Sequence, residues 1–419
     1  MGAILFGAFL FFLILGVPIS FVLALSSIGA IFYAGYPLDV LSQRFFTGLD
    51  SFPLMAIPLF MLAGSIMGYG GITKRLVNFA LSFVGNIPGS LAHVVALSGI
   101  MMGGISGSGV ADTAAIGTIM IPEMTKRNYD RGFSAALIAA SGSIGLIIPP
   151  SIAMIIYGVT TQTSIGDLFV AGIVPGIMIG LGFMVYSYYV AKKNNYPKEG
   201  KISRRGQWKS LKDASWALAM PFIIIFGIRA GIFTPTEGGA VVVVYSLIIS
   251  VFVYKEIKLK DLPNILFESA ISTAIISTII AATTLFGWLL ASQQIPQQIT
   301  TTLLGVTDNK ILLLLLINLI LLISGMFLDS GPAIMLLAPI LAPVAINLGV
   351  NPVQFGLVMV LNLTIGLLTP PVGTAMYVSS NISGVPILQL SRKLIPFWLI
   401  MIFVLLIVTY VPSLTTIFL

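Results

Sequence analysis

Two polar, glycine-rich runs, residues 103–112 and 324–332, interrupt long apolar stretches, and each run contains an aspartate. About sixteen mostly apolar residues precede the first run and about thirteen follow it. Each arm is a helix of about 20–25 Å, which is shorter than the roughly 30 Å hydrocarbon core of a bilayer. The pattern predicts two re-entrant helical hairpins. Irregular backbone at membrane depth must face protein or a water-filled cavity, so each tip is a candidate coordination site.

Each predicted hairpin is followed by an apolar segment that a proline pair interrupts. Residues 141–150 and 362–371 share the pattern Ile-Gly-Leu-(Ile/Leu)-x-Pro-Pro. Proline has no amide hydrogen and clashes with the preceding turn, so carbonyl groups near it are freed from the helix. Secondary transporters bind sodium with such unwound carbonyls, and corresponding broken segments in two halves of a chain indicate the binding site. The repeated pattern therefore predicts one ion site in each half.

The predicted ion sites consist of small and hydroxyl-bearing residues at the tips and in the broken segments. The first sodium site would use Ser106, Gly107, Ser108, Ser141, Ser143, Gly145 and Pro149. The second would use Ser324, Gly325, Asn362, Thr364, Gly366 and Thr369. The alternative is that small residues merely allow helices to pack closely. The duplication of the whole pattern favours the ion sites.

Asp112 and Asp329 occupy equivalent places in the two runs. A carboxylate inside a membrane is costly and indicates a functional site. Each aspartate is predicted at the start of the second helix of its hairpin, where free N–H groups and the helix dipole stabilise negative charge. Two interpretations stay open at this stage: a helix cap that fixes the tip, or a carboxylate that binds the ion or couples to protons.

The composition is that of an integral membrane protein. Of 419 residues, 57% are hydrophobic and 8% are charged, and the mean hydropathy is +1.05. A soluble domain has about 25% charged residues. Long apolar runs without ten-residue alternation predict helices and exclude a transmembrane β-barrel. The chain has no cysteine and one histidine, so we expect neither disulfides nor a transition-metal site.

The predicted fold is an all-α polytopic membrane protein with two repeats at an offset of roughly 220 residues. Each repeat has five spans and a hairpin, and an odd number of spans makes the second repeat inverted. The predicted spans are residues 2–15, 17–34, 52–70, 130–160, 167–191, 214–230, 235–254, 269–293, 352–380 and 391–417. Residues 38–49 and 259–268 are amphipathic and are predicted to lie at the interface as arms.

The distribution of basic residues gives the orientation. With the N-terminus outside, only Arg44, Arg229 and Lys310 of the 21 lysines and arginines fall outside the internal loops. Positive charge accumulates on the cytoplasmic side, so both termini are predicted to be external. The net charge of +7 then follows from topology, and nucleic-acid binding is not expected.

An enzyme is the remote alternative. Residues 104–107 read Gly-Ile-Ser-Gly, as in intramembrane serine proteases, a chemistry that needs a histidine base. His93 is thirteen residues before Ser106 in the same predicted helix, a separation of about 20 Å, so no catalytic residues are assigned. The sequence has no nucleotide-binding motif either, so ATP hydrolysis is not expected to drive transport.

Several motifs resemble the large membrane subunit of tripartite ATP-independent periplasmic (TRAP) transporters. They lie at residues 103–117, 132–145, 148–151, 325–331 and 368–373. The resemblance implies the permease of a sodium-coupled importer of organic acids in a bacterial inner membrane, served by a periplasmic binding protein. The likeness is greatest to the sialic-acid branch. A C4-dicarboxylate permease and a stand-alone ion-coupled carrier of the same superfamily are the alternatives.

The same resemblance implies an elevator mechanism, in which a transport part slides against a scaffold. The transport part would comprise residues 88–160 and 309–380. The scaffold would comprise residues 1–87, 161–308 (with a cytoplasmic linker at 192–213) and 381–419. Substrate would lie between the tips, near Gly109, Ser330 and Thr374. A small four-helix membrane subunit is expected as a separate chain.

Overall fold

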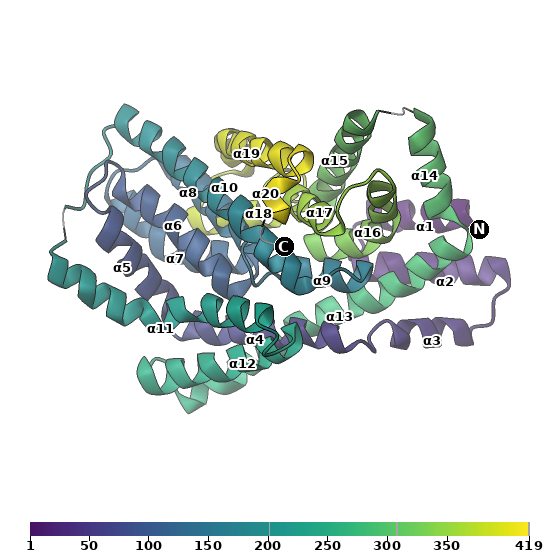
Figure 1. The fold of residues 1–419 in the computed structure, drawn as a ribbon, viewed down its shortest axis with the longest axis horizontal. Helices are drawn as coiled ribbons and strands as arrows, with labels where there is room; N and C mark the ends of the chain where they lie inside the picture. Colours follow the sequence, from purple (N-terminus) through teal and green to yellow (C-terminus); the bar gives the residue numbers. More distant parts are fainter. Residues whose placement is uncertain (201, 307–308, 418–419) are drawn as a thin grey trace.

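A computed structural model describes residues 1–200, 202–306 and 309–417, and all regular structure in these ranges is helical (Figure 1). A helix satisfies its backbone hydrogen bonds within one segment, as a bilayer requires. Eight described helical stretches are long and apolar enough to cross a membrane. The predicted all-α polytopic class is therefore confirmed.

The first glycine-rich run forms the turn between α6 (Ser90–Ser106) and α7 (Gly109–Lys126). A short turn leads from α7 to α8 (Arg131–Ser143). The 3₁₀ turn η2 (Ile144–Leu146) and a proline pair then separate α8 from α9 (Ile152–Thr161). Both α6 and α7 pack against α8. The structure thus has the predicted hairpin followed by a broken helix.

The second run forms the turn between α15 (Lys310–Phe327) and α16 (Ser330–Asn347). α17 (Pro352–Gly366) and α18 (Thr374–Ser383) follow, again separated by a proline pair. The sequence predicts apolar arms at residues 311–323 and 333–346. The helices are longer, because α15 and α16 have 18 residues each, as does α7 of the first hairpin, and α15 and α16 could cross a membrane by length and composition. The reason is that most of the polar run is itself helical, so the turn between the two helices is short.

The two hairpins and the two broken helices pack reciprocally. α7 of the first half packs along α18 of the second, and α16 of the second half packs along α9 of the first. The Ser379 hydroxyl of α18 donates to the Ala135 carbonyl of α8 at 2.7 Å. The Tyr157 hydroxyl of α9 donates to the Pro352 carbonyl at the start of α17 at 3.0 Å. The four hairpin helices and the four pieces of broken helix thus form one packed body.

Two long helices, α10 (Ile165–Lys193) and α19 (Ile387–Tyr410), complete this body. α10 packs against α6 and α17, and α19 packs against α8, α10 and α17. Phe183 of α10 and Phe397 of α19 meet edge to face, with ring centroids 5.2 Å apart, and both side chains are fully buried. The predicted division put both helices in the scaffold, whereas their contacts favour the body that holds the hairpins.

A second group of helices lies beside this body: α1 (Gly2–Ile14), α2 (Ile19–Ala34), α4 (Ala56–Tyr69), α12 (Pro235–Ile248) and α13 (Leu262–Ser292) (Figure 1). α12 packs on α4, and α13 packs on α2 and α4. This group meets the hairpin body where α4 contacts α6 and where α13 contacts α16. Two further helices, α5 (Ile72–Val84) and α11 (Arg204–Arg229), pack on each other, and α5 also packs on α6.

The shorter elements differ from the predictions in three places. The first arm is a separate helix, α3 (Asp39–Thr47), but the second arm is continuous with α13 after a single 3₁₀ turn. The linker is shorter than predicted, because α11 begins at Arg204. An additional helix, α14 (Ile295–Val306), was not predicted from the sequence, and it packs on α16.

Ion pairs join several of the loops that carry basic residues. Arg75 in the first turn of α5 pairs with Glu256, which follows α12, at 3.0 Å. Arg127 after α7 pairs with Glu199 in the segment between α10 and α11. We call the surface formed by the loops around Arg75, Arg127, Glu199 and Glu256 the basic face. The pair between Arg75 and Glu256 joins the two halves of the sequence.

Candidate functional site

The first tip is a tight turn that depends on glycine and serine. Gly107 has a left-handed backbone with φ of 65°, a conformation that glycine adopts without steric cost. Ser108 is extended and caps α7, because its hydroxyl oxygen accepts from the amide of Ala111 at 3.4 Å. The Ser106 hydroxyl oxygen accepts from the amide of Ser108 at 3.1 Å. The predicted tip residues therefore hold the turn together by local hydrogen bonds.

Asp112 lies inside this tip and is fully buried. Its Oδ1 accepts a hydrogen bond from the Ser106 hydroxyl at 2.6 Å, which ties the end of α6 to the first turns of α7. Its Oδ2 is buried and has no hydrogen-bond partner. The N-cap of α7 is Ser108, so Asp112 is not the cap. Burial of a carboxylate oxygen without a partner is costly, and a bound cation would offset that cost.

Glycines bring the tip into backbone contact with the broken helix. A Cβ at Gly107 would lie 2.5 Å from the carbonyl oxygen of Pro150, and a Cβ at Gly103 would lie 2.9 Å from the Cα of Gly145. A Cβ at Gly145 would meet Oδ2 of Asp112. The amide of Ile152 donates to the Gly107 carbonyl at 3.4 Å. The hairpin and the broken helix thus make backbone contact at these glycines, as the close-packing interpretation predicts.

Close packing does not account for every predicted residue of the first site. Ser141 and Ser143 are both fully buried. The Ser143 hydroxyl donates to the Ala140 carbonyl at 2.8 Å, whereas the Ser141 hydroxyl has no partner. Two oxygens around the first hairpin are therefore buried without partners: Oδ2 of Asp112 at the tip, and the hydroxyl of Ser141 in α8, which lies against Gly99 of α6. Oxygen ligands of this kind suit a hard cation such as sodium.

The second tip repeats the glycine contact. A Cβ at Gly366 would lie 2.6 Å from the Cα of Gly325, so the two helices touch backbone to backbone. The amide of Val372, beside the second proline pair, donates to the Met326 carbonyl at 3.1 Å. In both halves, then, an amide that follows the proline pair bonds to a carbonyl of the hairpin.

The second aspartate has different surroundings from the first. Asp329 occupies the N-cap position of α16, but its side chain accepts no capping hydrogen bond. Its Oδ1 accepts from the Thr374 hydroxyl at the start of α18 at 3.0 Å. Asp329 is exposed, whereas Asp112 is buried. The structure therefore does not give the two aspartates one common role.

Asn362 belongs to a polar chain that sequence reasoning did not find. Its Nδ2 donates to Oδ1 of Asn318 at 2.7 Å, and Nδ2 of Asn318 donates to the Thr409 hydroxyl at 3.2 Å. The chain joins α17 to α15 and α19. Oδ1 of Asn362 is buried without a partner. An asparagine in the run of leucines and isoleucines at 311–323 was the signal that could have identified Asn318.

The remaining hydroxyls of the second predicted site bond to their own helices. Ser324 donates to Ile320, Thr364 to Val360 and Thr369 to Ile365, at 2.7–2.8 Å. These bonds use the hydroxyl hydrogens and leave oxygen lone pairs. The ion role of these residues stays a prediction.

The three predicted substrate residues lie in different settings. A Cβ at Gly109 would lie 3.1 Å from the Cα of Ser143, so Gly109 is part of the contact between hairpin and broken helix. The Thr374 hydroxyl donates a hydrogen bond to Asp329. Ser330 is the first residue of α16, beside Gly331, whose Cβ would lie 3.4 Å from Ile156 of α9. Their contact with substrate stays a prediction.

The fold and the paired tips define a membrane transporter, and the sequence comparison gives its family. Residues 6–414 match the family described as "Tripartite ATP-independent periplasmic transporter, DctM component". The chain belongs to this family and is a TRAP transporter large permease subunit. It is a transporter subunit, not an enzyme, and the Ser106 hydroxyl is bonded to Asp112 and not to a histidine.

Curated relatives align along nearly the whole chain. The isethionate TRAP permease DctMQ of Oleidesulfovibrio alaskensis is 43% identical over 99% of this chain, which spans 66% of that relative. The sialic acid TRAP large permease SiaM of Vibrio cholerae is 41% identical over 96% of this chain and 94% of the relative. The C4-dicarboxylate TRAP large permease DctM of Rhodobacter capsulatus is 37% identical over 98% of this chain and 97% of the relative.

Solved structures support the fold. MtrF of Neisseria gonorrhoeae superposes with a TM-score of 0.64 at 14% identity, over 89% of this chain and 83% of that one. The YdaH transporter of Alcanivorax borkumensis superposes with a TM-score of 0.58 at 15% identity, over 88% of this chain and 87% of that one. At these identities the similarity extends to the fold alone.

Proposed function

We propose that this permease couples the uptake of an organic acid to sodium, with one ion site at each hairpin tip. The observation that carries the proposal is the first tip, where Oδ2 of Asp112 is buried without a partner. The Ser141 hydroxyl of α8, in a segment that packs against Gly99 of α6, is also buried without a partner. The second hairpin has the same glycine contact, and Asn362, four residues before Gly366 in α17, has a buried Oδ1 without a partner. Small residues at both tips let backbone carbonyls approach an ion closely.

We further propose an elevator mechanism with inverted repeats. The reciprocal packing of α7 on α18 and of α16 on α9 supports a transport part built from both halves. The contacts of α10 and α19 with the hairpin body support adding them to the predicted transport segments, 88–160 and 309–380. The scaffold would then be the group around α4, α12 and α13, with α3 as an arm.

The proposed location is a bacterial inner membrane with the basic face toward the cytoplasm. Positive charge accumulates on the cytoplasmic side of such membranes, which supports this orientation. Gly2 at the start of α1 approaches Ile295 of α14, and the end of α19 approaches the start of α15. Neither contact involves the loops of the basic face, so both termini are proposed to be periplasmic.

The proposed partners are a periplasmic substrate-binding protein and a separate small membrane subunit. The family name supports the periplasmic component. The relatives' names include isethionate, sialic acid, C4-dicarboxylates and 2,3-diketo-L-gulonate, all of them organic acids. We propose sialic acid as the first substrate to test, followed by isethionate and C4-dicarboxylates.

Uptake into proteoliposomes tests the proposal. The permease and its small subunit would be reconstituted with labelled sialic acid, with or without binding protein, under an inward sodium gradient or under choline. We expect uptake only when sodium and binding protein are both present. Uptake that does not depend on the binding protein would favour the stand-alone carrier. Uptake that does not depend on sodium would refute sodium coupling but not membership of the family. If only sialic acid is not taken up, the substrate is another organic acid.

A further inference from the structure

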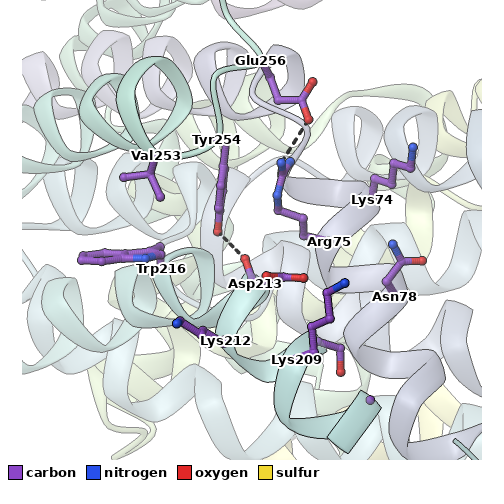
Figure 2. Close-up of a pocket in the computed structure, with 12 residues that line it drawn as sticks. Lys74, Arg75, Asn78, Lys209, Lys212, Asp213, Trp216, Val253, Tyr254 and Glu256 are labelled. Atoms are coloured by element: carbon purple, nitrogen blue, oxygen red, sulfur yellow. Dashed lines mark hydrogen bonds and ion pairs between the residues drawn. The ribbon is translucent and has the colours of Figure 1, made fainter.

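A cavity of about 600 Å³ opens on the basic face, away from both tips (Figure 2). It lies between α5, the N-terminal turns of α11 and the segment that follows α12. Lys74 and Arg75 come from α5, and Lys209 and Lys212 come from α11. In Figure 2 Trp216 lies on the opposite side of Tyr254 from Arg75. The cavity therefore has cationic walls and an aromatic side.

The charge in this cavity is not balanced. Arg75 pairs with Glu256 at 3.0 Å and lies over the ring of Tyr254, with its guanidinium carbon 3.9 Å from the ring centroid. Lys74, Lys209 and Lys212 form no ion pair with any residue of the described ranges, and all three are exposed. Against them the cavity has one further carboxylate, Asp213. Three lysines and one aspartate leave a surplus of two positive charges, which favours an anionic ligand.

The aromatic residues place the cavity at the level of a membrane surface. α11 is polar and basic over 204–213 and apolar over 214–228, and Trp216 lies just after the change. Tryptophan and tyrosine concentrate at the boundary between headgroups and hydrocarbon. The Tyr254 hydroxyl donates to the Asp213 carbonyl at 2.9 Å, which fixes the tyrosine at this boundary (Figure 2). Half of the Trp216 surface is exposed (49%).

An apolar strip leads away from the cavity in the direction of the hydrocarbon. Val253 lines the cavity and is 43% exposed, and Phe252 beside it is 71% exposed. One and two turns earlier along α12, Ile248 and Val244 are 50% and 56% exposed. A ligand with an anionic head and acyl chains would match both the cationic cavity and this strip, whereas a soluble anion would use the cavity alone.

We propose that this cavity binds the phosphate-bearing headgroup of an anionic phospholipid of the surrounding membrane. Lys74, Lys209 and Lys212 would contact the phosphate, and the acyl chains would lie along Phe252 and Ile248. Basic pockets between transmembrane helices on the cytoplasmic side are known to suit such headgroups. The site is separate from the proposed ion sites, because it lies on the basic face, and the proposal does not depend on the substrate.

Native mass spectrometry of the purified permease tests the proposal. The probe lipid is phosphatidylglycerol, with phosphatidylethanolamine as the zwitterionic comparison of zero net charge and inorganic phosphate as the soluble anion. The test variant is Lys209→Gln/Lys212→Gln, and the matched control is Lys198→Gln/Lys260→Gln, which removes two exposed lysines of the basic face outside the cavity. All four lysines are exposed, so both variants should fold, and size-exclusion elution checks this.

We expect the wild type and the control to bind phosphatidylglycerol in preference to phosphatidylethanolamine. The test variant should bind it about 5-fold more weakly for each lysine removed, or roughly 25-fold for the pair. Equal losses in the two double variants would overturn the site, because charge alone would then explain binding. Displacement of the lipid by inorganic phosphate at millimolar concentration would overturn the lipid in favour of a soluble anion. Displacement by the small subunit would overturn it in favour of a protein contact.

Discussion

The Ser106 hydroxyl lies 2.6 Å from Oδ1 of Asp112, while Oδ2 of the same carboxylate is buried beside Gly145 without a hydrogen-bond partner. One oxygen therefore fixes the tip, and the other is free for a ligand. A carboxylate that only held the turn would gain nothing from the burial of Oδ2. Of the two interpretations left open for Asp112, the helix cap is excluded, because Ser108 caps α7, and Oδ2 remains available to the proposed ion.

Replacement of Asp112 tests ion binding. In wild-type protein we expect sodium to raise the melting temperature relative to choline, since a ligand at a hundred times its Kd stabilises by about 2.7 kcal/mol. Asp112→Asn keeps the shape of the side chain and removes its charge, so the part of this rise that comes from the first ion site should be lost, and the total rise should be smaller than in the wild type. Asp39→Asn, an exposed aspartate in α3, is the control and should keep the rise. An undiminished rise in Asp112→Asn would show that the carboxylate does not contribute to ion binding.

The glycine contact at the second tip gives a prediction about packing. A methyl group at Gly366 would meet the backbone of Gly325, which cannot rotate away as a side chain would. We expect Gly366→Ala to destabilise the protein by about 1–3 kcal/mol and to abolish uptake. At Gly68 of α4 a Cβ would meet nothing within 4 Å, so Gly68→Ala should be neutral or slightly stabilising. Thermal unfolding and uptake by both variants provide the check, and equal effects would contradict the contact.

The hairpins and broken helices could be predicted because their signals are local. The turn at Gly107 needs a left-handed backbone, which glycine allows, and a proline pair follows the end of both α8 and α17. Both kinds of break are therefore recognisable in the sequence. The lengths of α15 and α16 were not predictable in the same way. A polar run can be a turn or a helix end, and the sequence does not show that the run at 324–327 is helical.

The different settings of Asp112 and Asp329 could not be predicted, because they depend on distant contacts. The two aspartates occupy matching places in the sequence, yet one bonds within its own hairpin and the other bonds to α18. The same limit applies to Asn318, whose partners Asn362 and Thr409 are 44 and 91 residues away. Local pattern fixes where the chain breaks, but tertiary packing decides which polar atoms meet.

The ion pair between Arg127 and Glu199 leads to a prediction about the basic face. Arg127 bonds to both Glu123 and Glu199, and the Glu199 side chain is only 20% exposed. Removal of the arginine leaves a largely buried carboxylate without its partner, so we expect Arg127→Gln to cost about 1 kcal/mol of stability. Lys126→Gln is the control: Lys126 also pairs with Glu123, but its side chain is 70% exposed, and the change should be near zero. Chemical denaturation in detergent would show the difference, and equal losses would refute it.

Tyr129 gives a prediction about pH on the same face. Its side chain is buried (4% exposed), its ring centroid is 4.3 Å from that of Tyr196, and burial raises its pKa from 10.0 to about 12. A group whose pKa is raised by folding stabilises the protein below its unfolded pKa, and this contribution is lost as the pH rises through the folded pKa. Tyr129 should therefore contribute to a fall in stability between about pH 10 and 12. Phenylalanine cannot ionise, so the melting temperature of Tyr129→Phe should fall less steeply over this range, whereas Tyr33→Phe, at a side chain that is 67% exposed, should follow the wild type. Identical slopes in all three proteins would mean that Tyr129 is not ionised by unfolding in this range.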